Sequence, residues 1–257
     1  MSPVKCSGCR NGDALDFAIS MAFQPIVDLD THLPFAYEAL VRGTNGEPAH
    51  SILSQVTDGN RYAFDQKCRV KAIETATAAG LLDGDAKLSI NFLPNAVYSP
   101  AACIALTLAT AKTVGLPASR LIFEFTENEE IADPAHTANI VASYRQMGFG
   151  TALDDFGAGH AGLNRLARFQ TDYIKLDMEL TRDIDTSMPR RMIVSAMVQL
   201  ASAMGMTVIA EGIETDAELR AVRDIGVRYV QGYIFARPQL RRLPAIAIPP
   251  STMALRA

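Results

Sequence analysis

The sequence has no tryptophan and only 4 cysteines among its 257 residues. Cys68 and Cys103 stand alone in helix-like segments, where we expect them to be buried in the core. Cys6 and Cys9 form a CxxC pair near the N-terminus, but no second Cys/His pair with zinc-like spacing follows. So few and so scattered cysteines exclude a fold framed by disulfides and disfavour a structural zinc or redox site.

Long apolar runs and basic runs are also missing. No stretch approaches the roughly 18 uninterrupted apolar residues of a membrane helix, and the N-terminus shows no signal pattern, so we expect a cytoplasmic protein without a membrane partner. The 24 basic and 28 acidic residues give a formal net charge of −4. With no basic run to follow a phosphate backbone, polymeric DNA or RNA is a poor candidate partner, whereas a small nucleotide is compatible.

What the sequence does contain is a regular alternation of short β-like and helix-like runs. Helix starts lie between the β-like runs: Ser99 and Asp133 each precede a proline, and Thr215 with Glu218 forms a capping box. Apolar residues recur at three- and four-residue steps in 190–204, which predicts a helix covering a sheet with this stripe. The stripe consists of Met192, Ile193, Ala196, Met197, Leu200, Ala203 and Met204. Eight runs are predicted strands: 22–28, 35–42, 87–93, 121–127, 151–157, 173–177, 207–213 and 229–235.

Eight strand and helix units in about 250 residues predict one α/β domain, a TIM-like (β/α)8 barrel, rather than an open sheet. We place this domain at 13–240, between an N-terminal extension at 1–12 and a C-terminal tail at 241–257. The tail contains several prolines and no strong period, so we expect it to be a surface extension.

Polar side chains interrupt most of the predicted strands. An unpaired carboxylate inside a barrel would cost several kcal/mol in desolvation, so something positive should lie among these acids. The carboxyl ends of the parallel strands converge on one mouth, where barrel enzymes keep their active sites. Oxygen ligands match hard cations such as Mg²⁺ or Mn²⁺. The candidate ligands are Glu38, Asn91, Glu124, Asp154, Asp155 and Glu211.

Two further features concern the same strand ends. Adjacent Asp154 and Asp155 would face opposite ways in a regular strand, so both can bind metal only where the strand ends or bends. Two metal ions sharing one carboxylate would suit a phosphate ester. Arg42 follows Glu38 by four residues and could grip a phosphate oxygen, although a surface salt bridge explains its spacing equally well.

The sequence resembles the EAL-type cyclic di-GMP phosphodiesterases, which are named after the three residues found here as Glu38-Ala39-Leu40. Further matches follow in the family's order over about residues 20–240. They are FQPIVD (23–28), EALVRG (38–43), NFLP (91–94), EFTE (124–127), DDFGAG (154–159), KLD (175–177), AEGIE (210–214) and QGY (231–233).

The resemblance implies a modified barrel whose first strand runs antiparallel to the others. It implies hydrolysis of cyclic di-GMP to linear pGpG with two Mg²⁺ or Mn²⁺ ions, Ca²⁺ being inhibitory. Glu38, Asn91, Glu124 and Asp154 match the ligands of one metal. Asp154, Asp155 and Glu211 match those of the other, so that Asp154 would bridge the two.

The resemblance also implies roles for other residues. Lys175 and Glu211 would position and deprotonate the attacking water, and Glu214 would steady the lysine. Glu127 would hold the loop after the fifth strand, which departs from the family's usual DFGxGYSSL by carrying His160, Ala161 and Gly162. The residues expected to contact the substrate are Gln24, Leu40, Arg42, Asp177 and Gln231.

Two other functions are compatible with parts of the pattern. One is a catalytically silent EAL-type receptor that binds cyclic di-GMP or a protein partner. The other is a metal-dependent barrel acting on sugars or carboxylates as an isomerase or lyase, which fits the acids but fits Arg42 and the ordered motifs poorly. The family commonly dimerises, so we expect a homodimer.

Overall fold

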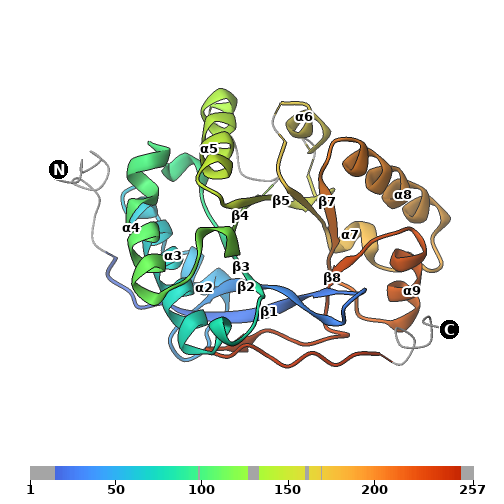
Figure 1. Cartoon of the computed structure of the whole chain (residues 1–257), viewed down its shortest axis with the longest axis horizontal. Coiled ribbons are helices and arrows are strands. Elements are labelled where there is room, and N and C mark those ends of the chain that lie inside the picture. Colours follow the sequence, from blue (N-terminus) through green and yellow to red (C-terminus); the bar gives the residue numbers. More distant parts are fainter. Residues whose placement is uncertain (1–14, 98, 127–132, 160–161, 169, 250–257) are drawn as a thin grey trace.

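A closed ring of strands forms the centre of the protein, with helices around it (Figure 1). The computed structural model describes residues 15–97, 99–126, 133–159, 162–168 and 170–249. The sheet runs in the order β2-β3-β4-β5-β6-β7-β8-β1, and a further pairing of β2 with β1 closes the barrel. The strands are β1 (Ser20–Asp28), β2 (Leu33–Arg42), β3 (Lys87–Asn91), β4 (Leu121–Thr126), β5 (Gly150–Phe156), β6 (Tyr173–Leu176), β7 (Thr207–Ala210), β8 (Tyr229–Gln231) and β9 (Gln239–Leu240).

The first strand differs from the others in direction. β1 is antiparallel to both of its barrel neighbours, β2 and β8. The remaining pairs from β2 to β8 are parallel. The modified barrel with an antiparallel first strand is therefore confirmed, and all eight predicted strands are present. β7 and β8 end earlier than predicted; after β7 the chain turns at Gly212, whose φ is +69°.

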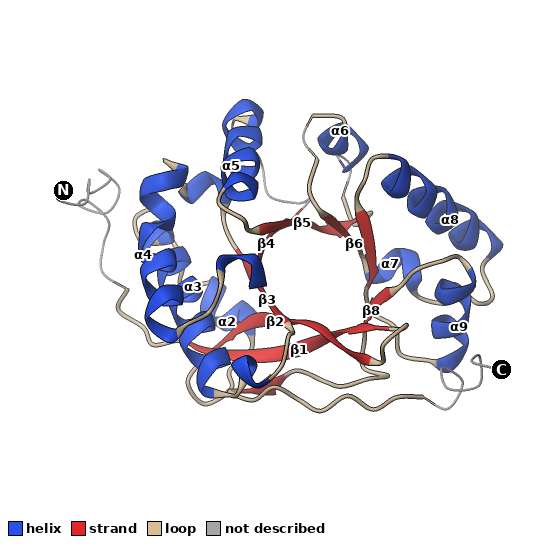
Figure 2. Ribbon diagram, in the orientation of Figure 1, coloured by secondary structure: helices blue, strands red, loops and turns tan. Residues whose placement is uncertain are grey.

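Helices lie outside the strands in both ribbon views (Figure 2). The capping box predicted for Thr215 and Glu218 is present at the start of α9. Asp133 caps α5 by accepting hydrogen bonds from the backbone N–H groups of Ala135 and His136. The helices are α2 (Ala49–Leu53), α3 (Arg61–Ala78), α4 (Pro100–Val114), α5 (Pro134–Gln146), α6 (Gly162–Leu166), α7 (Met178–Thr181), α8 (Met188–Ala203) and α9 (Asp216–Asp224).

The helix predicted within 190–204 is present as α8, but Met197 is the one member of the predicted stripe among its buried residues, so most of the predicted covering face is wrong. Val194, Met197 and Ala201 are its buried residues. Met192 and Leu200, members of the predicted stripe, are 66% and 38% exposed. Apolar residues occur on both faces of this helix, so periodicity alone could not tell which face meets the barrel.

The C-terminal segment lies against the barrel. β9 pairs with β1, and further along the Ala247 N–H donates to the Phe235 carbonyl at 2.9 Å. Leu243, Ile246 and Ile248 pack against the core. In Figure 1 this segment, coloured towards red, runs beside β1. The described part of the tail therefore covers the barrel instead of extending from its surface.

An apolar floor separates the polar end of the barrel from the opposite opening. Ile26, Ala36, Ile122, Ala152 and Ile209 form a buried cluster, against which aromatic rings pack. These rings belong to Phe35, Tyr173 and Tyr229, and the Phe35 centroid lies 4.2 Å from that of Tyr229. Polar side chains above this floor therefore lie in a closed-ended cup.

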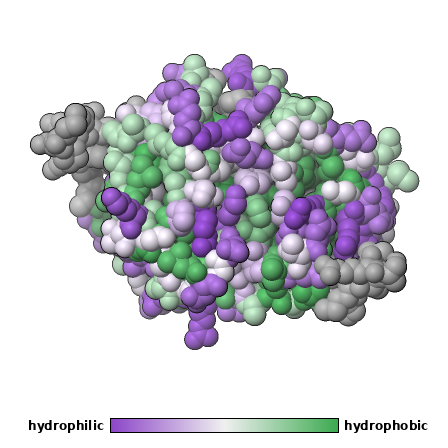
Figure 3. All heavy atoms as spheres, viewed as in Figure 1, coloured by the Kyte–Doolittle hydropathy of each residue, from purple (hydrophilic) through white to green (hydrophobic). Residues whose placement is uncertain are grey.

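Other expectations concern the core and the surface. Cys68 and Cys103 are buried and free, as predicted. Hydrophobic and hydrophilic side chains are interspersed on the face shown in Figure 3. Within the described part of the chain, no helix has the combination of length and apolar content needed to cross a bilayer.

Candidate metal centre

Lys175 lies at the centre of a cluster of acids in the cup. Its Nζ is 2.8 Å from Glu211 Oε1, 2.9 Å from Asp154 Oδ1, 3.1 Å from Glu124 Oε2 and 3.5 Å from Glu38 Oε2. These side chains come from β2, β4, β5, β6 and the residue after β7. Strand ends that are distant in sequence thus bring four carboxylates onto one ammonium group.

The carboxylates form two groups that share a member. Glu38, Glu124 and Asp154 offer oxygens that all lie within 4.8 Å of one another, and so do Asp154, Asp155 and Glu211. Asp154 belongs to both groups. Two cation positions joined by one carboxylate would require this arrangement. The assignment of these residues as ligands stays a prediction.

Asp155 reaches the mouth because the strand bends at this position. Its φ is +54°, in the left-handed region that non-glycine residues rarely occupy. The pairing of β5 with β6 also shifts register between Leu153 and Phe156. The bend that the sequence required for Asp154 and Asp155 to share one site is therefore present.

Amide and hydroxyl groups donate hydrogen bonds to two of the acids. Glu38 accepts hydrogen bonds from Gln231 Nε2 at 2.7 Å and from Asn91 Nδ2 at 3.2 Å. Glu124 Oε1 accepts one from the hydroxyl of Ser89 at 2.5 Å. Sequence reasoning missed Ser89, although its position two residues before Asn91 places both on one face of the strand.

Burial and mutual repulsion disfavour the ionised acids. Burial raises the pKa of Glu124 to about 8, although Lys175 acts in the opposite direction. Burial, together with the neighbouring Asp154, raises the pKa of Asp155 to about 6. Burial also raises the pKa of Asp154 and Glu211.

Two members of the cluster are held in their charged forms. Burial would raise the pKa of Glu38, but the Lys175 charge and the amide hydrogen bonds outweigh it, so this pKa is lowered. Burial would lower the pKa of Lys175, but the surrounding carboxylates raise it well above its ordinary value. One ammonium therefore faces four carboxylates, with Asp155 beside them, and divalent cations with oxygen ligands would relieve the repulsion among these acids.

Two cavities adjoin the acid cluster, and both reach Glu38 and Asp155. The cavity beside β8, of about 250 Å³, is lined by Gln24, Asp177 and Gln231. The cavity over β2 and β3, of about 370 Å³, is lined by Leu40 and Arg42 together with mainly apolar side chains. The five residues expected to contact substrate thus line two cavities on either side of the acids.

Three of these five residues make hydrogen bonds to the main chain. Asp177 Oδ1 accepts the Glu179 N–H at 2.8 Å and so caps α7. Gln24 Nε2 donates to the Ala236 carbonyl at 3.4 Å. Arg42 Nη1 donates to the carbonyl of the preceding residue at 2.7 Å.

Glu214 lies away from Lys175. Glu214 was expected to steady Lys175, but its exposed carboxylate lies 3.5 Å from Arg182 Nη2, and it is not among the described ion-pair partners of the lysine. It does line the cavity beside β8. Glu127 and His160, like Cys6 and Cys9, lie outside the described residues.

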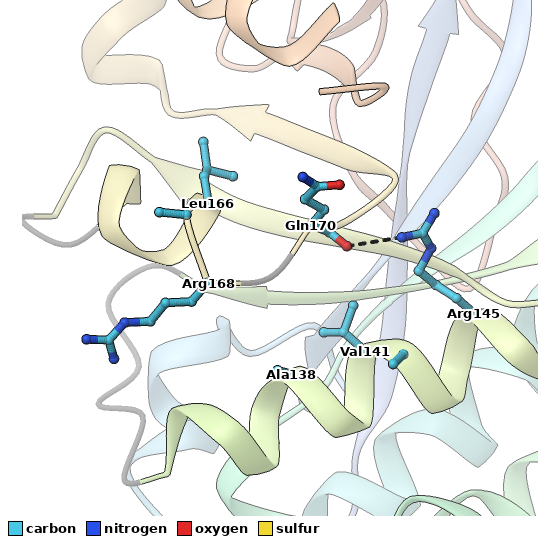
Figure 4. A pocket seen from close by; sticks show the side chains of 8 residues that line it. Ala138, Val141, Arg145, Leu166, Arg168 and Gln170 are labelled. Carbon is cyan, nitrogen blue, oxygen red and sulfur yellow. Dashed lines mark hydrogen bonds between the residues drawn. The ribbon is translucent and has the colours of Figure 1, made fainter. Parts of the chain in front are cut away.

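A further cavity of about 360 Å³ lies on the surface between α5 and α6 (Figure 4). Val141 and Leu166 contribute to its lining, and Arg145 donates to the Gln170 carbonyl at 3.4 Å across one edge. Its lining residues include none of the acids around Lys175. This cavity is therefore separate from the candidate metal centre.

Comparison with known proteins adds independent information. The family model described as EAL domain matches residues 14–238. The blue light- and temperature-regulated antirepressor BluF of Escherichia coli is 35% identical over 228 residues, which cover 89% of this chain and 56% of BluF. The cyclic di-GMP phosphodiesterase RocR of Pseudomonas aeruginosa is 39% identical over 123 residues, covering 48% of this chain and 31% of RocR. The chain thus spans only about half or less of these curated relatives.

Solved structures are similar over nearly the whole barrel. A standalone versatile EAL protein from Vibrio cholerae O395, in its c-di-GMP bound form, is 48% identical with a TM-score of 0.87, covering 91% of this chain and 98% of the other. Klebsiella pneumoniae BlrP1 in a manganese and cyclic di-GMP complex is 33% identical with a TM-score of 0.83, covering 91% of this chain and 60% of the other.

Proposed function

Because the chain belongs to the EAL domain family, we propose that it hydrolyses one phosphodiester bond of cyclic di-GMP to give linear pGpG. The observation that carries the proposal is the gathering of four carboxylates around Lys175, with Asp155 beside them, between two cavities. Homologues named as cyclic di-GMP phosphodiesterases support the same reaction class.

The proposed cofactors are two Mg²⁺ or Mn²⁺ ions per site. Glu38, Asn91, Glu124 and Asp154 would hold one, and Asp154, Asp155 and Glu211 the other. When bound, these cations would supply Lewis-acid stabilisation of charge on the phosphate and lower the pKa of a coordinated water. The manganese complex of BlrP1 supports this choice, and we expect Ca²⁺ to inhibit.

Lys175 and Glu211 are the proposed groups that act on the attacking water. A glutamate carboxylate at this position can accept the proton of the attacking water. The protonated Lys175 Nζ lies 2.8 Å from Glu211 Oε1, and its three N–H donors face four carboxylates. Cations that took over these carboxylates would leave an N–H of Lys175 to orient the water.

The cavities on both sides of the acids suit a substrate with two bases. Cyclic di-GMP carries a guanine on each side of its phosphate ring. The cavity beside β8 offers polar groups from Gln24, Asp177 and Gln231 to the edge of one base. The cavity over β2 and β3 is more apolar and presents Arg42, whose guanidinium can stack on a base or pair with a phosphate.

The test is incubation of the purified protein with cyclic di-GMP and Mn²⁺ or Mg²⁺, followed by chromatographic detection of pGpG. We expect release of pGpG that stops with EDTA and with Ca²⁺. An absence of pGpG after hours with either activating metal, while the protein remains folded, would refute the enzyme proposal.

A second candidate is a silent receptor that binds cyclic di-GMP and acts on a partner protein. The observation in its favour is the similarity to BluF, which is named as an antirepressor. Equilibrium binding of cyclic di-GMP without any turnover in Mn²⁺ would favour this function. The presence of both groups of acids supports turnover, because two cation positions sharing Asp154 would suit the cleavage of a phosphate ester.

The homodimer and the cytoplasmic location also stay predictions. Light scattering on the eluting protein measures the mass directly, and a mass of about twice 27.8 kDa would support the dimer.

A further inference from the structure

Ser89 lies on β3 at the boundary between the apolar floor and the acid cluster. Its neighbours across the sheet are Glu38 of β2 and Ile122 of β4, and its side chain is fully buried. Since alternate residues of a strand face the same way, Ser89 shares the inner face with Asn91. The adjacent Leu88 and Ile90 point to the other face, where they join the outer core.

The Ser89 hydroxyl bonds one oxygen of Glu124 while Lys175 bonds the other. Ser89 Oγ donates to Oε1 at 2.5 Å, and Lys175 Nζ donates to Oε2 at 3.1 Å. Glu124 is itself fully buried, so solvent does not compensate its oxygens. Two donors on opposite oxygens fix the plane of the carboxylate, which one donor alone would leave free to rotate.

Packing does not account for a hydroxyl at this position. Beneath Ser89 lies the apolar floor, to which Ile122 belongs, and the side chains of this floor offer the hydroxyl no hydrogen-bond partner. A buried hydroxyl costs free energy unless it makes a hydrogen bond. The bond to Glu124 is therefore what the hydroxyl contributes.

We propose that Ser89 is a positioning residue for the proposed reaction. It holds the Glu124 carboxylate where its oxygen converges with those of Glu38 and Asp154, and thereby raises the affinity of this group for a divalent cation. The inference rests on the proposed function only in taking these acids to bind metal. Hydrogen-bond partners of metal ligands typically change metal affinity by about 10- to 100-fold when removed.

The test compares Ser89→Thr with Ser89→Val, because threonine and valine have the same shape and only threonine keeps the hydroxyl. Mn²⁺ affinity is measured by calorimetry on substrate-free protein. Hydrolysis of cyclic di-GMP then gives kcat and KM. We expect Ser89→Thr to bind Mn²⁺ within about 3-fold of the wild type and Ser89→Val to bind about 10- to 100-fold more weakly, with the loss in activity recovered at high Mn²⁺.

Thr151→Val is the matched control. Thr151 is also a buried strand hydroxyl, but it donates to Asp172 Oδ2 at 2.9 Å, outside the acid cluster. We expect this variant to melt at a lower temperature and to keep its Mn²⁺ affinity. A loss of Mn²⁺ affinity equal to that of Ser89→Val would overturn the proposal, because any lost hydroxyl would then have the same effect.

Equal Mn²⁺ affinities for the threonine and valine variants would also overturn it. If the added methyl group prevents both from folding, Ser89→Ala replaces them, and an affinity equal to the wild type then contradicts the role of the hydroxyl. Failure of the enzyme proposal is distinguishable: wild-type protein that binds Mn²⁺ without releasing pGpG refutes hydrolysis and leaves the Ser89 comparison intact.

Discussion

Replacing Lys175 with methionine should make the stability of the fold depend on divalent metal. The methionine keeps most of the apolar stem but removes the ammonium that faces four carboxylates at 2.8–3.5 Å. Removing one partner of a buried ion pair costs about 3–5 kcal/mol, because the other charge is left uncompensated. Proton uptake by the acids offsets part of this cost, so we expect a loss of about 3 kcal/mol in the free energy of unfolding with EDTA present.

Urea unfolding followed by circular dichroism measures this loss. A cation that binds only the folded chain, present at a concentration of about 100 times its Kd, stabilises the fold by about 2.7 kcal/mol. Mn²⁺ should therefore recover most of the lost stability. Lys87→Met is the control: Lys87 contacts the rings of Phe35 and Tyr173 below the apolar floor, and its loss should cost under about 1 kcal/mol with or without Mn²⁺.

A free energy of unfolding for Lys175→Met within about 0.5 kcal/mol of the wild-type value in EDTA would refute this prediction, since exposed charges produce effects of that size. The prediction also fails if Mn²⁺ stabilises the wild type and leaves the variant unchanged. The first result would mean that the acids are already neutral, and the second that they do not form the cation site.

Three further predictions concern other parts of the barrel. Glu38→Ala should lower pGpG release by about 100-fold or more while the circular dichroism melt remains cooperative; unchanged turnover would refute the metal assignment. Burial raises the pKa of Asp28, but the bidentate Arg228 contact outweighs it, so the pKa is lowered. The extra stability of wild type over Asp28→Asn should therefore be present above about pH 4 and vanish as pH falls further; a constant difference in melting temperature would contradict this. In Gly232→Ala, the new Cβ would lie 1.8 Å from the Ile213 carbonyl oxygen, so about 1–3 kcal/mol of stability should be lost in urea, and an unchanged midpoint would refute the close approach.

The architecture was predictable because its signals are local. Alternating strand and helix runs, proline-marked helix starts and the Thr215 capping box each depend on a few neighbouring residues. The count of eight units then selects a closed barrel. The direction of β1 is a different matter: it depends on pairing with β2 and β8, which no local pattern specifies, and only the family resemblance indicated it.

The site was predictable to the extent that topology alone brings residues together. Acids at parallel strand ends must share a mouth, and the structure brings Glu38, Glu124, Asp154 and Glu211 onto Lys175 there. Contacts that depend on side-chain direction were not predictable. Glu214 turns to Arg182 because it stands in the exposed turn after β7.

Where a segment has apolar residues on more than one side, the sequence could not show which side is buried. α8 is apolar on two sides, and the packing of Val194 against the barrel, instead of Met192, is decided by tertiary contacts. The tail lacks any period, yet Ile246 and Ile248 find apolar partners beside β1.

Titration of the substrate-free chain with Mn²⁺, followed through the electron paramagnetic resonance of the free ion, decides whether the gathered carboxylates hold metal. We expect two ions per chain at saturation. Glu124 belongs only to the first group of acids and Asp155 only to the second. Glu124→Ala and Asp155→Ala should therefore each lower the affinity for a different one of the two ions. A wild-type chain that leaves all added Mn²⁺ free at millimolar concentration would contradict the metal centre and the hydrolysis built on it.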